Sequence, residues 1–410
     1  MKAEIIAIGS ELLTPDHIDS NSLYLTQKLN ESGFEVHLKS VVGDNVEDIE
    51  RLLRESLSRS KITLLCGGLG PTEDDVTRAA TARALNRRLI LNQEILDALH
   101  RRFELRGYRM ARINERQAEI IEGAEILENR VGTAPGMWIE DQGACLALLP
   151  GPPRELQPMF ESQVAHHIRE LGAGRRLEKR ILGVQGIPES EVDSRVAPIY
   201  KAYPAIQTTI LAAKGCITLR LQTWLGPGEE SSDLDTLADR VCAELGDAVF
   251  TRTGEKLEAV VGRMLRQSGS TIAVAESCTA GMIGSTITRI EGSSEYFLGG
   301  VTCYSNKLKT RLCLVPSELI ERHGAVSAEV AEAMARGVRE VIGSNIGLAV
   351  TGIAGPGGGS EQKPVGLVYF GLADASRCIH VRRVLPGDRE MVRELATTSS
   401  LGCLRRFLLK

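Results

Sequence analysis

Residues 271–281 read TIAVAESCTAG. An apolar run is followed by a turn that holds Ser277, Cys278 and Thr279, and a segment with helical spacing begins after Gly281. This order predicts a strand that runs into a helix, and ligands of open α/β sheets bind where the strands end. The first N–H groups of such a helix can hold an oxyanion or a phosphate beside Ser277. The alternative is structural, in which Ser277 or Thr279 only caps the helix.

The chain as a whole has the composition of a multidomain α/β protein. Its 410 residues exceed what one core usually serves, so we expect two or three domains, and the 41 glycines suit tight turns between strands and helices. The formal net charge of −4 argues against nucleic acid or an anionic membrane as the main partner. The chain shows no signal peptide and no spanning apolar run, and its nine cysteines are scattered, so a cytoplasmic location with reduced thiols is expected.

The first 170 residues alternate strand and helix patterns. Strands are expected near residues 3–8, 35–43 and 61–68, each followed by a helical segment. This rhythm predicts a mainly parallel sheet covered by helices on both faces, which is a three-layer α/β domain. Two further strands, near 124–129 and 144–151, precede a helix whose first turn holds two prolines.

The most informative stretch of this half is GGLGPTEDD, residues 67–75. Its paired glycines let the backbone approach a ligand closely, and Glu73, Asp74 and Asp75 crowd the expected helix start. Thr72 and Asp75 have the spacing of a capping box, which is a purely structural alternative. Capping does not need three successive carboxylates, so we favour a divalent cation that bridges to phosphate oxygens.

Two more carboxylates would lie at the same edge of the sheet as residues 67–75 if the strands are parallel. Glu11 follows the first strand and Glu155 follows LPGPP. Beyond this domain, residues 171–180 lack periodicity and are expected to form a linker. Residues 178–250 then predict a small α+β module whose GVQG segment is similar to the GxxG loop of KH nucleic-acid modules. The segment has no Lys or Arg, so we favour a packing or hinge role.

The last domain offers a nucleophile and a base. Ser277 is the candidate nucleophile and Lys309 the candidate base, because only His323 lies before the last expected strand and a Ser–His–Asp arrangement is poorly supplied. A lysine base must be neutral, which requires burial or cationic neighbours that lower its pKa. Cys278 is a rival nucleophile, and its structural alternative is a small buried filler.

A phosphate cradle is suggested further along the same domain. The segment TGIAGPGGG, residues 351–359, combines with Arg389 and Arg393, which lie four residues apart at the start of the terminal helix. Backbone N–H groups and guanidinium groups both suit phosphate. A plain turn and solvated arginines are the alternatives.

Several motifs together resemble a known family. AESCTAG, YSNKLK, HGAVS, TGIAGPGGGSEQKPVG and PGDREMVR, in this order, resemble the nicotinamide mononucleotide amidase domain of the CinA (competence/damage-inducible protein A) family. GSELL, DSN, GGLGPTEDD, APG and LPGPPRE resemble the molybdopterin-binding-like domain of the same proteins, and the middle module is similar to their KH-like insert. One departure is Ala280, where the family commonly has a second glycine.

The resemblance implies domains at 1–170, 177–250 and 253–410, and an amidase of the Ser/Lys type that needs no cofactor. It implies Ser277 as nucleophile, Lys309 as base and Tyr304 as an aid to proton transfer. The residues implied for substrate and phosphate binding are Thr279, Thr351, Gly352, Gly355, Gly357, Arg389 and Arg393. The substrate would be nicotinamide mononucleotide, and a homodimer is expected.

For the N-terminal domain, the resemblance implies an ADP-ribose pyrophosphatase that depends on a divalent metal of the Mg²⁺ or Co²⁺ class. The implied metal ligands are Asp19, Asp74 and Asp75, and the implied nucleotide site contains Ser10, Glu11, Asn21, Gly67, Gly68, Gly70, Thr72 and Glu155. Both activities would serve pyridine-nucleotide salvage. Two alternatives stay open: an N-terminal domain that only binds nucleotide, and a non-enzymatic partner in DNA uptake or repair.

Overall fold

The structure, a computed structural model, describes residues 1–172 and 174–410, which divide into two compact units. The first unit contains Met1–Glu178 and Trp224–Glu230, and the second contains Lys179–Thr223 and Ser231–Lys410. None of the helices in the described ranges combines the length and apolarity that crossing a lipid bilayer requires. The chain has the expected α/β fold, and the two units are described separately.

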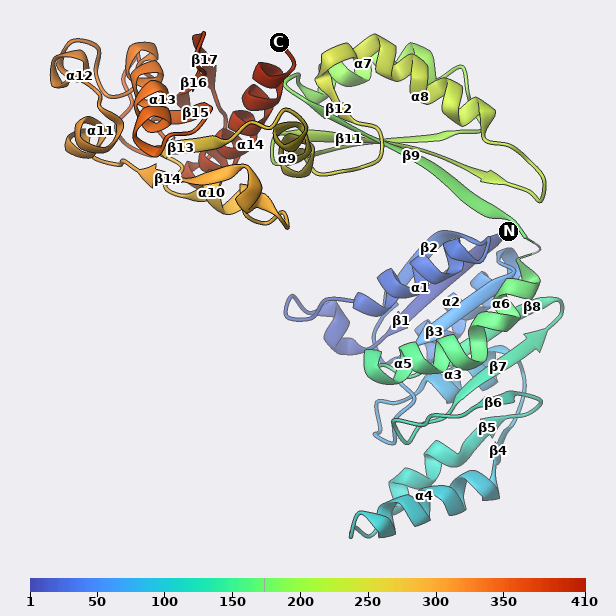
Figure 1. The fold of residues 1–410 in the computed structure, drawn as a ribbon. Coiled ribbons are helices and arrows are strands. Elements are labelled where there is room, and N and C mark those ends of the chain that lie inside the picture. The colour runs from blue at the N-terminus through green and yellow to red at the C-terminus, as the bar shows by residue number, and fades with distance from the viewer. Residues whose placement is uncertain (173) are drawn as a thin grey trace. The chain divides into compact units, whose positions relative to one another are not determined.

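The first unit is built on one sheet with the strand order β2-β1-β3-β8-β7-β6 (Figure 1). Its strands are β1 (Lys2–Ile8), β2 (Glu35–Val42), β3 (Ile62–Cys66), β6 (Glu125–Leu127), β7 (Gly136–Asp141) and β8 (Ala144–Leu149). β2, β1, β3 and β8 run parallel, whereas β7 and β6 are antiparallel to their neighbours. The expected mainly parallel sheet is confirmed.

Helices cover both faces of this sheet. They are α1 (Ser20–Glu31), α2 (Val46–Arg59), α3 (Thr77–Ala84), α4 (Gln93–Leu105), α5 (Pro153–Met159) and α6 (Ala165–Leu171). Along β1, Ala3, Ile5 and Ala7 join the core beneath α1, α5 and α6, whereas Ile6 and Ile8 join the core beneath α2 and α3. Successive side chains of the strand point to opposite faces of the sheet and thus fill two cores. The sheet and the helices on its two faces form three layers.

Short elements complete the first unit. They are the antiparallel pair of β4 (Leu89–Leu91) and β5 (Glu119–Ile121) and the short helical segments η1 (Ser10–Leu13), η2 (Arg112–Ala118) and η3 (Phe160–Val164). Strand β7 was not expected from the sequence. It forms a hairpin with β8 through Gln142 and Gly143, which both have positive φ (45° and 86°). Gly143 fits such a turn, but a glutamine is a weak signal for it.

The start of α3 corrects the capping-box interpretation. The helix begins at Thr77 with Val76 as its N-cap, so the carboxylates of residues 73–75 precede the helix instead of crowding its first turn. The Asp75 carboxylate accepts from the Thr72 backbone N–H (2.9 Å) and from the Thr72 hydroxyl (2.5 Å). The Thr72–Asp75 pair therefore closes a turn ahead of the helix.

The second unit begins with the small α+β module. Its sheet has the order β10-β11-β9-β12, formed by β9 (Arg176–Gln185), β10 (Gln207–Ala213), β11 (Cys216–Leu225) and β12 (Val249–Thr251). The helices α7 (Glu189–Tyr200) and α8 (Ser232–Leu245) pack on it through a common core, and the short η4 (Gly246–Ala248) follows α8. The expected linker is wrong from residue 176 onward, because β9 starts there; its residue 173 lies outside the described residues. GVQG lies mostly within β9 and is not a loop.

The C-terminal part of the second unit has its own sheet, in the order β14-β13-β15-β16-β17 (Figure 1). The strands are β13 (Ile272–Glu276), β14 (Phe297–Thr302), β15 (Ile346–Gly352), β16 (Leu367–Ala373) and β17 (Cys378–Val384). β13, β14 and β15 are parallel, and β16 and β17 are antiparallel. β17 was not expected, because this edge strand is largely exposed and shows no clear apolar alternation.

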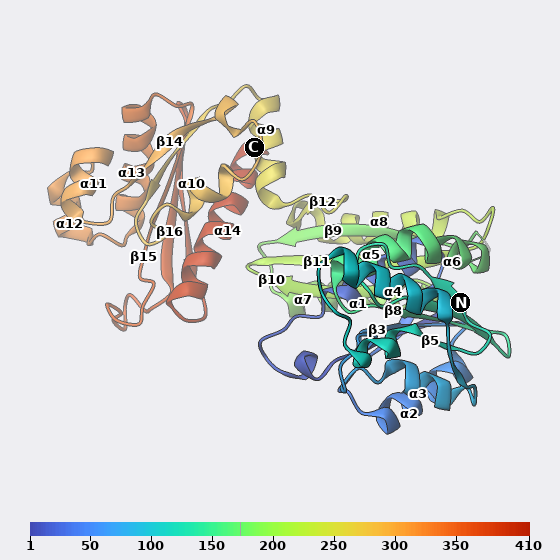
Figure 2. The ribbon, with the colours of Figure 1, turned by 90° about the horizontal axis from the view of Figure 1, so that it is seen from below.

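Helices again cover both faces (Figure 2). One face carries α9 (Leu257–Gln267), α10 (Met282–Ile287) and α14 (Arg389–Leu408), and the other carries α11 (Asn306–Cys313), α12 (Ser317–His323) and α13 (Ala328–Ile342); η5 (Ser293–Glu295) precedes β14. The Arg405 guanidinium joins this domain to the module by donating to the backbone oxygens of Asp247 and Val249, both at 2.7 Å.

Candidate functional site

The turn after β13 lies at the carboxyl edge of the parallel strands. β13 pairs with β14 on one side and β15 on the other, and the Ser277 backbone N–H donates to the Val350 oxygen of β15 at 3.0 Å. The register is thus continued by one residue beyond the strand. Ser277 is 7% exposed, so its hydroxyl sits in a largely desolvated position.

Glu276, which sequence reasoning did not single out, caps the helix that follows this turn. Its buried carboxylate accepts from the backbone N–H groups of Gly281 (2.9 Å), Ile283 (3.1 Å) and Gly284 (2.9 Å). Because those N–H groups are satisfied by Glu276, neither Ser277 nor Thr279 is a cap, and that alternative is wrong. The Ser277 hydroxyl is left available for another role.

Lys309 is that hydroxyl's partner. Helix α11 carries the lysine into the interior, where it is 2% exposed. Its Nζ lies 3.0 Å from Ser277 Oγ, 3.0 Å from the Cys303 oxygen and 3.4 Å from the Tyr304 oxygen. Among the described residues no carboxylate forms an ion pair with it, and burial lowers the pKa of Lys309.

The geometry around Nζ suits a neutral amine. A neutral amine has two N–H donors and one lone pair, and the two carbonyl oxygens of Cys303 and Tyr304 can only accept. If they take the two N–H groups, the lone pair remains for the Ser277 O–H. The candidate base and the candidate nucleophile are therefore in direct contact, as covalent catalysis would require.

Cys278 is less suited to be the nucleophile. It is 5% exposed and packs within the apolar core beside Val274 and Ile283. Burial raises the pKa of the Cys278 thiol to about 11, which keeps it protonated at neutral pH. Its position fits the structural alternative of a buried filler.

The turn itself presents backbone donors. Within the part of the chain that the structure describes, the N–H groups of Cys278, Thr279 and Ala280 donate to no protein oxygen. Arg393 holds this turn from behind, because its guanidinium donates to the Cys278 oxygen (3.0 Å) and the Thr279 oxygen (3.2 Å). Fixed N–H groups beside a nucleophile are the usual means of stabilising an oxyanion.

The glycine-rich loop after β15 adjoins Arg389. This guanidinium donates to the Gly355 oxygen (2.8 Å) and to the hydroxyl of Tyr304 (3.0 Å), whose side chain is 57% exposed. A Cβ at Gly357 would meet no atom within 4 Å, so a ligand can approach the backbone there. The Arg389 side chain is exposed to solvent, whereas Arg393 is already hydrogen-bonded to the turn that holds Ser277.

Of three other predicted residues of this site, two make structural contacts and one has a hydroxyl that is unpaired within the described chain. The Thr351 hydroxyl donates to the Ala325 oxygen at 2.8 Å, and a Cβ at Gly352 would lie 2.7 Å from Val368. Thr279 is fully buried, and its hydroxyl has no partner among the described residues. The first two shape the loop, and Thr279 has an uncommitted hydroxyl at the nucleophile turn.

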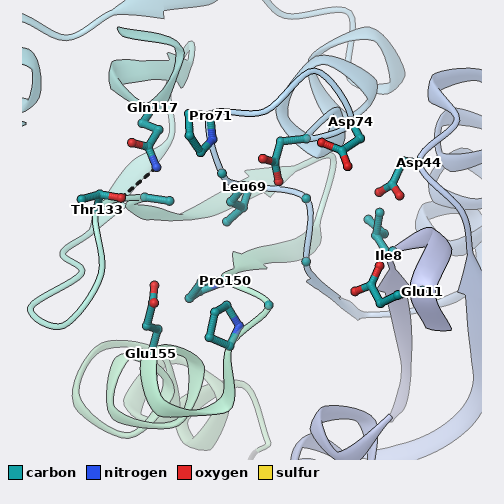
Figure 3. A pocket seen from close by; sticks show the side chains of 18 residues that line it. Ile8, Glu11, Asp44, Leu69, Pro71, Asp74, Gln117, Thr133, Pro150 and Glu155 are labelled. Atoms are coloured by element: carbon teal, nitrogen blue, oxygen red, sulfur yellow. Dashed lines mark hydrogen bonds between the residues drawn. The ribbon is translucent and has the colours of Figure 1, made fainter. Parts of the chain in front are cut away.

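A separate cavity of about 390 Å³ opens at the carboxyl ends of the parallel strands in the first unit (Figure 3). In the view of Figure 3, Glu11, Asp44 and Asp74 lie on its right side, and Glu155 lies across from them. Asp44, which follows β2, was missed because a single Asp between two loop residues gives no signal. The expectation that Glu11 and Glu155 meet at one sheet edge is confirmed.

The glycines of this cavity permit a close backbone path. A Cβ at Gly67 would lie 2.1 Å from the Ile8 oxygen, and one at Gly68 would lie 2.2 Å from the Thr77 hydroxyl. Buried Arg78, also missed from the sequence, holds the loop by donating to the Leu69 and Gly70 oxygens. Burial lowers the pKa of Arg78 to about 10, and the charge of Asp75 opposes this shift.

Four residues predicted for this site do not line the cavity. Asp19 caps α1 by accepting from the Ser22 N–H (2.9 Å), and Thr72 bonds Asp75. The other two support cavity-lining residues: the Asn21 amide donates to the Gly151 oxygen (2.6 Å), and the Ser10 N–H donates to the Asp44 carboxylate (2.8 Å).

The predicted metal set is not assembled as such. Among the described residues, no group of three or more His, Cys, Asp or Glu side chains is gathered closely enough to hold an ion. Magnesium is usually held by one or two carboxylates together with substrate phosphates, so a preformed cage is not required. Asp74, Asp44 and Glu11 all line this cavity, and one or two of these carboxylates beside an open glycine backbone would fit a hard cation that substrate phosphates also ligate.

Comparisons with known proteins cover nearly the whole chain. Residues 254–408 match the family model described as "CinA C-terminal domain", and residues 4–170 match "Probable molybdopterin binding domain". A CinA-like protein of Koribacter versatilis is 47% identical over the full length of both chains. A CinA-like protein of Solibacter usitatus is 47% identical, covering 99% of this chain and 98% of that one. The crystal structure of CinA from Thermoplasma acidophilum is 28% identical, covers 41% of this chain and 99% of that chain, and gives a TM-score of 0.38.

Proposed function

The chain belongs to the CinA family, and from this premise we propose that its C-terminal domain hydrolyses nicotinamide mononucleotide to nicotinate mononucleotide and ammonia. The observation that carries the proposal is the contact of 3.0 Å between buried Lys309 Nζ and Ser277 Oγ. A lysine in this setting has no evident structural purpose, because burying an amine without a carboxylate partner is costly.

The first half of the reaction forms an ester. Neutral Lys309 takes the proton of the Ser277 hydroxyl as Oγ attacks the carboxamide carbon, and the carbonyl oxygen becomes an oxyanion. The free N–H groups of the nucleophile turn lie beside Ser277 to stabilise that charge. The C–N bond then breaks, and the ammonium of Lys309 returns its proton to the departing nitrogen, which leaves as ammonia.

The second half releases the acid. A water molecule gives a proton to Lys309 and attacks the ester carbon, and the tetrahedral species collapses with the proton returning to Ser277 Oγ. The products are a carboxylate and a regenerated Ser277–Lys309 pair. The Tyr304 hydroxyl accepts from Arg389 at 3.0 Å, and its proposed role is to assist proton movement.

The phosphate of the nucleotide is assigned to the glycine-rich loop and Arg389. The exposed guanidinium already reaches the Gly355 oxygen, and Gly357 leaves space for a ligand. Holding the phosphate places the carboxamide against Ser277, so binding energy at a remote group supports the chemistry.

For the N-terminal domain we propose a metal-dependent cleavage of ADP-ribose at its diphosphate. The supporting observation is the cavity in which Glu11, Asp44 and Asp74 face a glycine-rich strand end. A bound divalent cation supplies neutralisation of the diphosphate and polarisation of the attacked phosphorus. Asp74, with Asp44 or Glu11, would hold the cation together with the phosphate oxygens of the substrate, and the Gly67–Gly68 backbone would lie against the phosphates.

The test is direct. Purified full-length protein is incubated with nicotinamide mononucleotide and ammonia is measured, and separately with ADP-ribose and several divalent metals while AMP is measured. Ammonia release that depends on Ser277 supports the amidase, and its absence rejects it. If ADP-ribose binds but is never cleaved with any metal, the N-terminal domain is a nucleotide-binding module instead.

The non-enzymatic role in DNA uptake or repair has less support. The chain is net acidic, and a protein that binds nucleic acid neutralises phosphates with clustered Lys and Arg. A titration with double-stranded DNA at two salt concentrations separates this role from the hydrolase, because electrostatic binding weakens steeply with salt.

A further inference from the structure

A cavity in the second unit is not used by the proposed chemistry. It measures about 430 Å³ and lies between the small α+β module and the C-terminal sheet domain. Its walls come from the β10–β11 hairpin, β12, the start of α9, α10 and α14, and neither Ser277 nor Lys309 lines it. Small-molecule sites occur preferentially at such junctions between packed parts.

Part of the wall of this cavity is apolar, although polar and charged residues also line it. Phe250, Leu257, Met282 and Leu401 line it, one each from β12, α9, α10 and α14. An aromatic ring, a thioether and two leucines are surfaces that bind a planar ring well. Four separate elements thus converge to form a surface suited to a flat apolar group.

The positively and negatively charged side chains that line the cavity differ in number when those paired with each other are left out of the count. Lys214 pairs with Glu394 at 2.8 Å, so these two charges satisfy each other. The Glu255 carboxylate likewise pairs with Arg263 at 2.9 Å. Both pairs are internal to the protein and leave no charge for a ligand.

Two cations remain. Within the described chain, the side chains of Lys256 and Arg289 form no hydrogen bond or ion pair, and both line the cavity. Only the Glu258 carboxylate is left on the acidic side. An occupant with one negative charge would therefore match the excess at the rim.

We propose that this cavity binds a small amphipathic anion, which is a planar aromatic ring system with one negatively charged group. The ring lies among Phe250, Met282 and Leu401, and the anionic group faces Lys256 and Arg289. Cationic side chains bind carboxylate, sulfonate or phosphate through charge-assisted hydrogen bonds. The proposal does not depend on the amidase, because it concerns binding alone.

The occupant would touch both helices that frame the nucleophile turn. Met282 and Thr286 lie on α10, which directly follows the turn, and Thr398 lies on α14, the helix that also carries Arg393. Arg393 donates to the turn's carbonyl oxygens. Binding here contacts the frame of the Ser277 site without entering it.

A matched pair of probes tests the proposal on the full-length protein. 8-Anilinonaphthalene-1-sulfonate is an aromatic anion, and N-phenyl-1-naphthylamine is its neutral counterpart without the sulfonate. Fluorescence titration should show one site per chain that binds the anion about tenfold more tightly than the neutral probe, the scale of one charge-assisted hydrogen bond. Equal affinity for both probes would overturn the charge assignment and with it the proposal.

Variants locate the site. The double change Lys256→Gln and Arg289→Gln removes both charges and should reduce affinity for the anion to that of the neutral probe, whereas Arg382→Gln, which removes one charge on exposed β17, should leave it unaltered. Thr398→Phe fills the cavity and should remove binding of both probes. The exposed charge variants keep the test informative if Thr398→Phe does not fold. Unchanged binding of the anion in the double variant would place its site elsewhere and reject the proposal.

Discussion

The two strand ends that carry the candidate sites differ in the charge they bring to a substrate. After β13 a buried lysine meets a serine, and the nearest carboxylate, Glu276, is occupied by three backbone N–H groups. After β1, β2 and β3 of the first unit, carboxylates face a cavity instead. The same α/β edge therefore suits an uncharged amide without an added ion in one case, and a diphosphate with a cation in the other.

The largest expected effect on either site is the loss of amidase activity when the proposed nucleophile, Ser277, is removed. Ser277→Ala should lower amidase kcat by about 10³-fold or more, because no other group can form the ester. Cys278→Ala is the matched control, since the pKa of its thiol is raised to about 11 and it packs in the core. Ammonia release from nicotinamide mononucleotide is the measurement. A dead Cys278→Ala enzyme and an active Ser277→Ala enzyme would reverse the assignment.

The next largest effect is expected when Lys309 is replaced, and this substitution should change both kcat and the pH dependence of the free energy of unfolding. Lys309→Met should lower kcat by about 10² to 10⁴-fold, the range for losing a general base. Wild-type activity should rise with pH as the lowered pKa of Lys309 is passed, with this acid limb below the ordinary lysine range. A pH–rate profile with the limb near the ordinary lysine pKa would contradict the role of burial.

The stability of the same variant follows from linkage. Between the lowered folded pKa of Lys309 and its ordinary unfolded value, the unfolded chain binds more protons, so the free energy of unfolding rises with pH. Lys309→Met removes this dependence. The advantage of the variant over wild type should therefore grow as pH falls from about 10.5, and denaturant melts at several pH values measure it. A stability difference between variant and wild type that does not change with pH would show that folding does not shift the pKa of the lysine.

Chelation distinguishes the two edges within one molecule. Removing divalent metal should lower ADP-ribose cleavage at least about 100-fold and leave the amidase unaltered, because only the first site needs a cation for its substrate. Asp74→Asn should imitate the loss, whereas Glu73→Gln should not, since Glu73 points to Arg116 and does not line the cavity. An amidase that also fails on chelation would remove the contrast between the sites.

Sequence reasoning found the parts of each site that carry a local signal. A strand, a small-residue turn and a helix marked Ser277, and paired glycines after a strand marked residues 67–68. Groups whose role depends on distant backbone were missed. Arg78 resembles a surface arginine on a helix until the glycine loop folds over it, and Glu276 becomes a cap only through the turn that follows. Asp19 does carry a local signal, and the structure places it as the N-cap of α1 and outside the cavity lining, so its role as a metal ligand stays a prediction.

A smaller effect is expected in the C-terminal domain when Arg389, the proposed phosphate ligand, is replaced. Arg389→Ala should weaken binding of nicotinamide mononucleotide by about 1.5 to 3 kcal/mol, the scale for hydrogen bonds to charged groups. The dephosphorylated riboside should be little affected. Arg393→Ala should instead lower turnover of both substrates, because Arg393 holds the nucleophile turn. Binding and turnover of the two substrates are compared for each variant, and equal losses for Arg389→Ala would show that it does not contact the phosphate.

The smallest effect concerns Ala280, which stands where the family commonly has glycine. Its φ of 50° lies in the left-handed region, where a side chain other than that of glycine costs about 1 to 2 kcal/mol. Glycine also increases the entropy of the unfolded chain, which offsets part of that gain. Ala280→Gly should therefore stabilise the protein by less than about 1 kcal/mol, with Ala333→Gly in the interior of α13 as a control that destabilises. Thermal melts of both variants decide it, and a destabilised Ala280→Gly protein would show that the turn holds alanine without strain.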